Sequence, residues 1–366
     1  MPKSSVVVVQ LGPHQLEMRD YPVPSVGEDD ALLRVERCGI CGSDVEQFDG
    51  AFSWIPFPVI PGHEPVGIVE EIGPIAAKRW GLEAGDRVAV ESAVPCMACR
   101  YCSRAEFNIC PNRKNIGYVS IDEPPTLWGG YSEYLHLPAN ALVHKISSDL
   151  PIDVAAVFNP LAGGIEWGAK APGTKLGDFV VVLGCGQRGI AAALAAKAVG
   201  ASTTVITGLN RDVHKLKLAL ELGIDHAINV ETDDVRALVA DYTAGVGADI
   251  VIDLVPVAAS TVVDALDLVR VGGTVVLAGV KGDVAATGLY TDQIPMKAIT
   301  VRGVRGKSFE TYEQTIALME SRRFPLERLS THTFGLSEAE KAIEVLAGRV
   351  PGEDAVFVSL DPQLGL

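Results

Sequence analysis

The sequence predicts a protein of the α/β plus β class, with a barrel-like all-β domain and a parallel, doubly wound domain. The chain has 366 residues, which is long enough for two domains of ordinary size. Its first third is rich in Pro and Gly and divides into short strands, which is typical of a barrel. From about Asn159 strands and helices alternate, which indicates a doubly wound sheet.

The first domain is predicted from three short segments. Residues 31–36 alternate roughly as a strand, and residues 62–72 are apolar and β-branched on both sides of Gly67. Residues 85–90 (GDRVAV) form another strand after a turn. Residues 350–360 predict a terminal strand that returns to this domain. We therefore expect a first domain at residues 1–158, a second at 159–299, and a return to the first at 300–366.

The second domain is predicted from buried strands that alternate with helices. Continuous apolar runs of this length are typical of parallel strands buried on both faces. The predicted strands lie at residues 179–183, 203–207, 248–255 and 274–280. The predicted helices lie at residues 189–200 and 211–222, and the second ends before Gly223, a residue favoured just after a helix.

Composition excludes two classes of partner. The net charge is −15 and the isoelectric point about 4.9, whereas a nucleic-acid-binding protein needs a basic face. The apolar run at residues 6–9 is too short to span a membrane, and no export signal is visible. We therefore expect no nucleic acid, no membrane and a cytoplasmic location. In that compartment cysteines are more often metal ligands or catalytic groups than disulfides.

Two groups of residues have the composition of metal sites. Four cysteines with the spacing C-x2-C-x2-C-x7-C can close a tetrahedral zinc site and leave no position open for chemistry; they are Cys96, Cys99, Cys102 and Cys110. A second set combines a thiol, an imidazole and a carboxylate, which suits a catalytic zinc that keeps a position for water or substrate. These residues are Cys41, His63 and Glu64.

A glycine-rich turn follows the predicted strand at 179–183. Residues 184–189 (GCGQRG) fit the dinucleotide-binding pattern between a buried strand and a helix. Gly184 makes the tight turn, Gly186 lets the backbone approach the diphosphate, and Gly189 permits close packing of helix on strand. Gln187 and Arg188 lie between the last two glycines, so we include them among the cofactor-binding candidates.

The end of the next strand bears on the choice between NAD and NADP. No carboxylate stands where the ribose 2′-hydroxyl of NAD is usually read, and Asp212 comes later. Gly208 leaves room there, and Asn210 and Arg211 offer groups for a 2′-phosphate, so the pattern favours NADP slightly. Alternatively, Arg211 is a solvated residue at the start of a helix. We add Val280, at the end of a later strand, as a cofactor-binding candidate.

These motifs together resemble the zinc-containing medium-chain alcohol dehydrogenases, in the branch that contains the sorbitol and threonine dehydrogenases. The resemblance rests on C-G-x-C-G-S-D at 38–44, on G-H-E-x-x-G-x5-G at 62–73, on GDRV at 85–88, on the four cysteines and on the later glycine-rich turn. Their order and spacing cover essentially the whole chain. The resemblance implies a GroES-like β-barrel catalytic domain, with a structural-zinc lobe at about 92–112, and a Rossmann cofactor domain.

The resemblance also implies roles for individual residues. Cys41 and His63 match two ligands of a catalytic zinc, and Glu64 matches a carboxylate that binds the metal or exchanges with water. Ser43 matches the hydroxyl that takes the proton of the substrate alcohol, and Asp44 a carboxylate that orients the site. The four cysteines at 96–110 match a structural zinc site, so two zinc ions are expected for each chain.

Three positions depart from the family pattern. The family has Cys or Glu at one further ligand position, where this chain has Asn159, so Glu64 or a water is expected to complete the zinc shell. A His that passes the proton outward is replaced by Glu46, which either takes over this relay or is an exposed acid without a role. Arg188 stands where the family has small or apolar residues. We expect its guanidinium either to face an anionic group of the cofactor or substrate or to point into a subunit contact.

The reaction implied by the resemblance is reversible hydride transfer between an alcohol and NAD(P), with a ketone or aldehyde as the product. An aromatic cluster that follows the first ligand favours a bulky or hydrophobic secondary alcohol, unless it is ordinary packing; it comprises Phe48, Phe52, Trp54, Ile55 and Phe57. The alternatives are a catalytically silent NAD(P)-binding sensor, a zinc-independent reductase of activated double bonds, and a zinc-stabilised binding module. A homodimer or homotetramer is expected, with residues 299–306 as an edge strand near a subunit contact.

Overall fold

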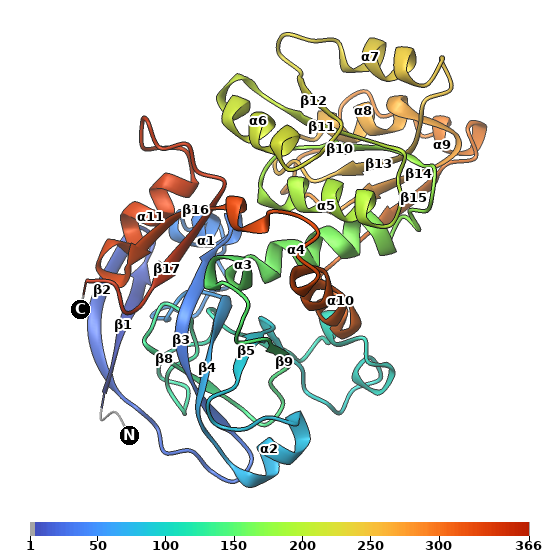
Figure 1. Ribbon diagram of the computed structural model, residues 1–366. Helices are drawn as coiled ribbons and strands as arrows, with labels where there is room; N and C mark the ends of the chain where they lie inside the picture. The colour runs from blue at the N-terminus through green and yellow to red at the C-terminus, as the bar shows by residue number, and fades with distance from the viewer. Residues whose placement is uncertain (1–3, 366) are drawn as a thin grey trace. The chain divides into compact units, whose positions relative to one another are not determined.

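The structure, a computed structural model, describes residues 4–365. The described chain forms two compact units, one from residues 4–159 and 308–365 and the other from residues 160–307 (Figure 1). The second unit thus ends at Lys307, and not at the predicted residue 299. The reason is that strand β15 (Thr300–Gly303) pairs with β14 (Val269–Leu277) and completes the sheet of the second unit.

The first unit is built on a seven-stranded sheet. Its order is β16–β17–β3–β4–β5–β9, with β8 paired to β3. The strands are β3 (Ala31–Ile40), β4 (Glu64–Ile72), β5 (Arg87–Val90), β8 (Tyr134–Leu137), β9 (Val143–Ile146), β16 (Ser330–Gly335) and β17 (Phe357–Asp361). The predicted return of the C-terminal strand is confirmed, because β17 pairs antiparallel with β3 and parallel with β16. The strand occupies only the end of the predicted segment 350–360.

The first unit also contains two short pairs of strands and several helices. They are the hairpin of β1 (Ser4–Gly12) and β2 (Gln15–Pro22), the small pair β6 (Ala93–Val94) and β7 (Lys114–Asn115), and the helices α1 (Gly42–Phe48), α2 (Pro74–Trp80), α3 (Ile152–Ala156), α10 (Phe309–Glu320) and α11 (Ala339–Leu346). Helix α4 (Phe158–Ile165) contains the boundary between the units.

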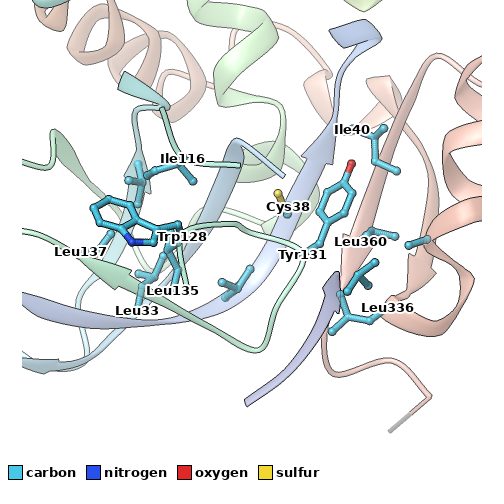
Figure 2. Close-up of a cluster of buried hydrophobic side chains, with 14 of the residues drawn as sticks. Leu33, Cys38, Ile40, Ile116, Trp128, Tyr131, Leu135, Leu137, Leu336 and Leu360 are labelled. Atoms are coloured by element: carbon cyan, nitrogen blue, oxygen red, sulfur yellow. The ribbon is translucent and has the colours of Figure 1, made fainter. Parts of the chain in front are cut away.

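The core of the first unit is apolar and closely packed. Figure 2 shows part of it, with labelled side chains from β3 and β8 near Trp128 and others from β3 and β17 near Tyr131. Tyr131 and Cys38 are fully buried. A side chain at Gly130 would stand 2.6 Å from the sulfur of Cys38, so only glycine fits there. Removing one of these large core side chains would cost about 3 to 5 kcal/mol.

The second unit is a parallel, doubly wound sheet in the order β12–β11–β10–β13–β14–β15. Its further strands are β10 (Phe179–Leu183), β11 (Thr203–Gly208), β12 (His226–Asn229) and β13 (Ala248–Asp253), and its helices are α5 (Gln187–Ala198), α6 (Val213–Glu221), α7 (Val235–Tyr242), α8 (Ser260–Leu268) and α9 (Gln293–Met296). The strand order reverses between β10 and β13, and this switch point is where such sheets bind ligands.

Several element boundaries in the second unit differ from the predictions, and two of them concern residues near the cofactor candidates. The helix predicted at 211–222 begins at Val213, because Asn210–Asp212 form a 3₁₀ turn. Strand β14 ends at Leu277, so Val280 lies in the following loop, where its side chain is 75% exposed. The sheet nevertheless has the predicted architecture, with the glycine-rich turn directly after β10.

Candidate catalytic metal centre and dinucleotide loop

The pairing of β3 with β4 brings the second set of metal-ligand candidates together. Gly39 stands opposite Glu64 in the antiparallel register, so Cys41, two residues further along, lies beside His63. One ligand atom from each of Cys41, His63 and Glu64 lies within 4.8 Å of the other two. All three residues are buried, at 2%, 6% and 0% exposure. The pairing of β3 with β4 thus brings a thiol, an imidazole and a carboxylate together in one cluster.

Two glycines make this approach possible. A Cβ atom at Gly39 would lie 2.8 Å from Oε2 of Glu64 and 2.9 Å from the ring of Phe357. Gly62 adopts a φ of +89°, which L-residues rarely adopt, and a Cβ there would lie 2.3 Å from the ring of Tyr131. The glycines on either side of the cluster are therefore required by packing and backbone geometry.

Cys41 is the N-terminal cap of helix α1. Its sulfur accepts a hydrogen bond from the backbone N–H of Ser43 at 3.5 Å. The carboxylate of Asp44 accepts one from the N–H of Cys41 through Oδ2 at 2.8 Å. Because the N-terminal end of a helix carries partial positive charge, this position favours the thiolate, which is the form that binds a metal.

His63 is oriented from both sides of its ring. Its Nδ1 atom lies 3.2 Å from Oδ1 of Asp44 and 3.3 Å from the hydroxyl of Tyr118. Its Nε2 atom lies 3.3 Å from Oγ of Ser43 and 3.9 Å from Oε1 of Glu64. An Nδ1–H that donates to Asp44 leaves the Nε2 lone pair directed into the cluster, which is the tautomer that a metal requires.

The electrostatics of the site favour a protonated imidazole when no metal is bound. Burial lowers the pKa of His63, but the charge and hydrogen bond of Asp44 outweigh it, so the pKa lies well above its usual value in the metal-free protein. Burial raises the pKa of Tyr118 to about 12, so its hydroxyl stays protonated at neutral pH. Tyr118 was not predicted to be part of the site, because it lies 55 residues from His63 and belongs to none of the motifs.

The two remaining candidates for this site lie on helices α4 and α1. Asn159 is in helix α4 and only 1% exposed. Glu46 is in helix α1 and partly buried. Zinc fits the cluster, because it accepts thiolate, imidazole and carboxylate ligands together. The roles of Asn159 and Glu46 stay predictions.

The four-cysteine lobe has the geometry of a closed zinc site. Four neighbouring sulfur–sulfur distances are 3.5, 3.6, 3.8 and 4.0 Å, between Cys99 and Cys102, Cys110 and Cys96, Cys99 and Cys110, and Cys96 and Cys102. A tetrahedron with Zn–S bonds of about 2.3 Å has edges of about 3.8 Å. Hydrogen bonds from backbone N–H groups, first that of Ala98, lower the pKa of Cys96 to about 6. The pKa of Cys99 is also lowered, first by a backbone hydrogen bond, whereas burial raises the pKa of Cys102 to about 12, so two of the four cysteines favour the thiolate before a metal binds.

The glycine-rich turn has a different reason for each glycine. Gly184 adopts a φ of +99°, which permits the sharp turn after β10. A Cβ at Gly189 would lie 1.8 Å from the carbonyl oxygen of Gly184, so packing of helix α5 requires glycine there. A Cβ at Gly186 would meet no described protein atom within 4 Å. Gly186 therefore leaves open space at the start of α5, where the partial positive charge of the helix N-terminus favours a diphosphate.

Residues around this turn complete the cofactor candidates. Gln187 is buried in the first turn of α5, and the guanidinium of Arg188 lies over the ring of Trp167 at 5.4 Å. Gly208 packs closely, because a Cβ there would lie 2.5 Å from the sulfur of Cys185. This packing is one reason for glycine at this position, and the predicted room for a cofactor stays a prediction.

Asn210 is held by polar groups from the end of β12. Its backbone N–H donates to Oε2 of Glu231 at 2.5 Å, and its side-chain oxygen accepts from Nδ2 of Asn229 at 2.7 Å. Arg211 is exposed in the same 3₁₀ turn. The carboxylate of Glu231 thus lies beside Asn210, one of the residues predicted to contact a 2′-phosphate, a point that the sequence pattern missed.

The predicted aromatic cluster divides into two parts. Phe48 and Ile55 are buried, at 1% and 7% exposure, and Phe48 belongs to the main core. Phe52 and Trp54 instead stack on each other and lead to Tyr118. Two surface hollows of about 490 and 460 Å³ lie around Arg87, and neither is lined by a ligand of the catalytic cluster.

Within residues 4–365, no helix is long and apolar enough to cross a membrane.

Sequence models of two protein families match the chain. The alcohol dehydrogenase GroES-like domain matches residues 27–148, and the zinc-binding dehydrogenase domain matches residues 189–321. A Mycobacterium tuberculosis protein named "Probable alcohol dehydrogenase adh" is 41% identical over 96% of each chain. An erythritol/L-threitol dehydrogenase of Mycolicibacterium smegmatis is 35% identical over 99% of each chain.

Solved structures agree with these relatives. An alcohol dehydrogenase from Thermotoga maritima superposes with a TM-score of 0.88 at 27% identity, over 98% of this chain and 99% of the other. An alcohol dehydrogenase from Thermus sp. ATN1 has a TM-score of 0.84 at 28% identity, over 97% and 99%. With both zinc clusters and the dinucleotide loop in place, the chain therefore belongs to the zinc-dependent, NAD(P)-linked alcohol dehydrogenases of the medium-chain family.

Proposed function

We propose that this protein reversibly oxidises a secondary alcohol with a bulky, apolar substituent to the ketone. The observation that carries this proposal is the position of Ser43, whose Oγ atom lies 3.3 Å from Nε2 of His63. That nitrogen is directed into the ligand cluster, so the serine hydroxyl stands beside the place where a substrate hydroxyl would be held. A proton acceptor at hydrogen-bond distance is what alcohol oxidation requires.

Cys41, His63 and Glu64 would hold the catalytic zinc, with Asn159 or a water as the fourth partner. Zinc, when bound, supplies a Lewis acid that lowers the pKa of an alcohol hydroxyl. A neutral amide is a weak ligand, so we expect Asn159 to hydrogen-bond to a water when Glu64 does not bind. The four cysteines at 96–110 would hold a second, structural zinc.

Ser43 would take the proton of the substrate hydroxyl and pass it outward. Glu46, one turn further along helix α1, is the proposed next acceptor. Asp44 keeps His63 in the tautomer that leaves Nε2 free, so the imidazole serves the metal and not the proton. The nicotinamide supplies the acceptor for the hydride that leaves the carbinol carbon.

The glycine-rich turn would hold the cofactor diphosphate, with Gln187, Arg188 and Val280 as further contacts. Cofactor preference rests on the end of β11. Asn210 and Arg211 favour a 2′-phosphate, whereas the nearby carboxylate of Glu231 opposes one by like-charge repulsion. The ratio of kcat/KM for NAD and NADP decides between them, and the variant Glu231→Gln should shift this ratio toward NADP.

We also propose that the chain works as a homodimer or homotetramer in the cytoplasm. The seven cysteines are all present as thiols, which a reducing compartment maintains. Strand β15 is the exposed edge of its sheet, which makes it a candidate for contact with a second copy. Sedimentation or light scattering of the purified protein measures the number of subunits.

The variant Cys41→Ala tests the assignment of the catalytic zinc. It should keep one zinc per chain and its fold, and it should lose alcohol oxidation. Cys38→Ala is the matched control, because Cys38 lies in the core three residues earlier and should leave both zinc ions bound. Turnover by Cys41→Ala with one zinc bound would refute the assignment.

The departure at Asn159 favours one second candidate, a silent cofactor sensor. Native protein that binds NAD(P) and one zinc ion per chain, but oxidises no member of a broad set of alcohols, would support the sensor. Reduction of activated double bonds by the Cys41→Ala variant would instead support the zinc-independent reductase. The first outcome is measured on the native protein and the second on the Cys41→Ala variant, and the two differ in the substrate that is tested.

A further inference from the structure

A buried ion pair lies at the carboxyl end of β13 in the second unit. Asp253 is the last residue of this strand and is fully buried. Its Oδ1 atom accepts a hydrogen bond from Nζ of Lys281 at 2.9 Å, and the side chain of Lys281 is 13% exposed. Lys281 lies in the loop after β14, so the ion pair joins the ends of two neighbouring strands. Neither residue belongs to a zinc cluster.

The ammonium group of Lys281 has an acceptor for each of its protons. Besides Asp253, it donates to Oγ1 of Thr261 at 2.9 Å and to the carbonyl oxygen of Val255, and three acceptors satisfy an ammonium group. Oδ2 of Asp253 lies 2.9 Å from the hydroxyl of Thr261, and Oδ1 also accepts from the N–H of Val255 at 3.1 Å. These contacts connect the loop after β14 with the loop after β13 and with helix α8. We call Lys281, Asp253 and Thr261 the lysine clamp.

The lysine clamp lies where a sheet of this kind binds a dinucleotide. Asp253 is paired in register with Leu183, the residue before the glycine-rich turn. The strand order reverses between β10 and β13, and a dinucleotide lies across such a point with one half on each side. The 2′-hydroxyl of the adenosine ribose is read at the end of β11, on the β10 side. We therefore expect the nicotinamide half on the side of β13 and β14, where the clamp lies.

The two loops that the clamp joins carry exposed apolar side chains. Val257 and Val280 are 64% and 75% exposed, and the N–H of Val257 donates to the carbonyl oxygen of Val280 at 3.0 Å. Val257 has a φ of +66°, which is unfavourable for a β-branched residue, and such strain is commonly kept where it serves a site. A Cβ at Gly184 would lie 3.2 Å from Cγ2 of Val255, so the loop after β13 also lies against the glycine-rich turn.

Stability alone does not require a buried ion pair at this place. Replacing such a pair by apolar residues of similar volume is often neutral or stabilising, whereas a charge pair can select one geometry of the groups around it. Building on the cofactor site of the proposed function, we propose that the lysine clamp positions the nicotinamide half of the cofactor. Lys281 holds the loops at 254–259 and 278–282 in one arrangement, in which Val257 and Val280 offer an apolar surface to the nicotinamide ring.

The test compares the binding of NADH with that of ADP-ribose, which lacks the nicotinamide ring. Calorimetry gives both affinities, and the fluorescence of bound NADH is the second readout. NADPH and 2′-phospho-ADP-ribose replace the two ligands if the native protein prefers NADP. The double variant of Lys281→Met and Asp253→Asn removes both charges, so it leaves no charge buried without its partner. It should bind NADH at least about tenfold more weakly and ADP-ribose within about twofold of the native affinity.

Thr261→Val is the milder variant, because Lys281 then loses only one of its three acceptors. It should weaken the binding of NADH about 2- to 10-fold and leave the binding of ADP-ribose unchanged. In both variants, hydrogen exchange at residues 278–282 of the cofactor-free protein should become faster. Thr261→Val also decides the proposal if the double variant does not fold.

Lys297→Met is the matched control. Nζ of Lys297 donates to three carbonyl oxygens near the amino end of β14, those of Leu266, Asp267 and Val269, at 2.7, 3.3 and 3.4 Å. This lysine therefore supports the same unit at the opposite edge of the sheet. The variant should lower the thermal midpoint and leave the ratio of the affinities for NADH and ADP-ribose unchanged.

The outcomes separate this inference from the proposed function. Equal losses for NADH and ADP-ribose in the clamp variants would mean that the clamp only supports the unit, and would overturn the inference, as would unchanged binding of NADH. A selective loss of NADH binding, in a protein that oxidises no alcohol, would keep the clamp and reject the proposed function. A native protein that binds neither ligand would reject the clamp together with the cofactor site.

Discussion

The carboxylate of Asp44 should control whether the catalytic zinc binds, and the variant Asp44→Asn tests this with almost no change in shape. Asp44 is 2% exposed and has one oxygen for each of two donors. Oδ2 accepts from the N–H of Cys41 at 2.8 Å, and Oδ1 lies 3.2 Å from Nδ1 of His63. An asparagine offers one oxygen and one NH₂ group to the same two neighbours.

The expected result follows from this mismatch. If the amide oxygen keeps the bond to Cys41, the NH₂ group faces Nδ1 of His63, and two donors cannot share that contact. The proton of His63 then moves to Nε2, which removes the lone pair that binds zinc. Changes to such supporting contacts cost about 10- to 100-fold in metal affinity or activity, which is about 1.4 to 2.7 kcal/mol.

The opposite orientation of the amide leads to a different loss. The N–H of Cys41 would then lack an acceptor in a buried place, at a cost of about 1 to 3 kcal/mol in the free energy of unfolding. Zinc content after dialysis against a chelator and the thermal midpoint together distinguish the two orientations. Asp49→Asn, at the end of the same helix in an exposed ion pair with Arg349, is the control and should keep both zinc ions.

An Asp44→Asn variant that retains both zinc ions, its thermal midpoint and its kcat/KM to within twofold would refute this reasoning. Such a result would mean that the orientation of His63 is set by Tyr118 alone. The double variant with Tyr118→Phe would then be the next measurement, because Tyr118 lies 3.3 Å from the same nitrogen.

Three further predictions concern other parts of the molecule. Cys99→Ser should release the structural zinc, which metal analysis detects, and should lower the thermal midpoint before it affects kcat. Zinc binding at the catalytic site must displace the proton of His63, because the pKa of this imidazole is raised in the metal-free protein. The affinity for zinc, measured in a metal-buffered titration, should therefore rise with pH by up to about tenfold per pH unit for this proton. An affinity for zinc that does not depend on pH would contradict this. Gly186→Val should raise the KM for the cofactor at least about tenfold with an unchanged thermal midpoint, whereas Gly189→Ala should lose about 1 to 3 kcal/mol of stability.

In the zinc-free protein, a rise in pH should lower the contribution of His63 to the free energy of unfolding, whereas it raises the affinity of the protein for zinc. A raised pKa in the folded state means that folding favours the protonated imidazole. This contribution is complete at pH values below the ordinary pKa of about 6.5 and is lost as the pH rises through the raised value. Urea unfolding of chelator-treated protein at several pH values measures it.

Elements with a strong local signal were predicted closely. The strand at 179–183 has the same bounds in the structure, and its five consecutive apolar residues are all buried there. The first unit ends at Asn159 and the second begins at Pro160, next to the residue where the sequence pattern changes. The boundary at 299 was wrong, because only the pairing of β15 with β14 decides which unit that strand joins.

The amino-acid sequence by itself determined both sets of zinc ligands and the dinucleotide turn, since metal and phosphate binding depend on residue types at short, fixed spacings. Tertiary structure decided how those groups are supported and what surrounds them. Tyr118 reaches His63 across 55 residues, and Glu231 reaches Asn210 between neighbouring strands. Such contacts follow from strand pairing and chain return, whose energies are spread over many residues and leave no local pattern.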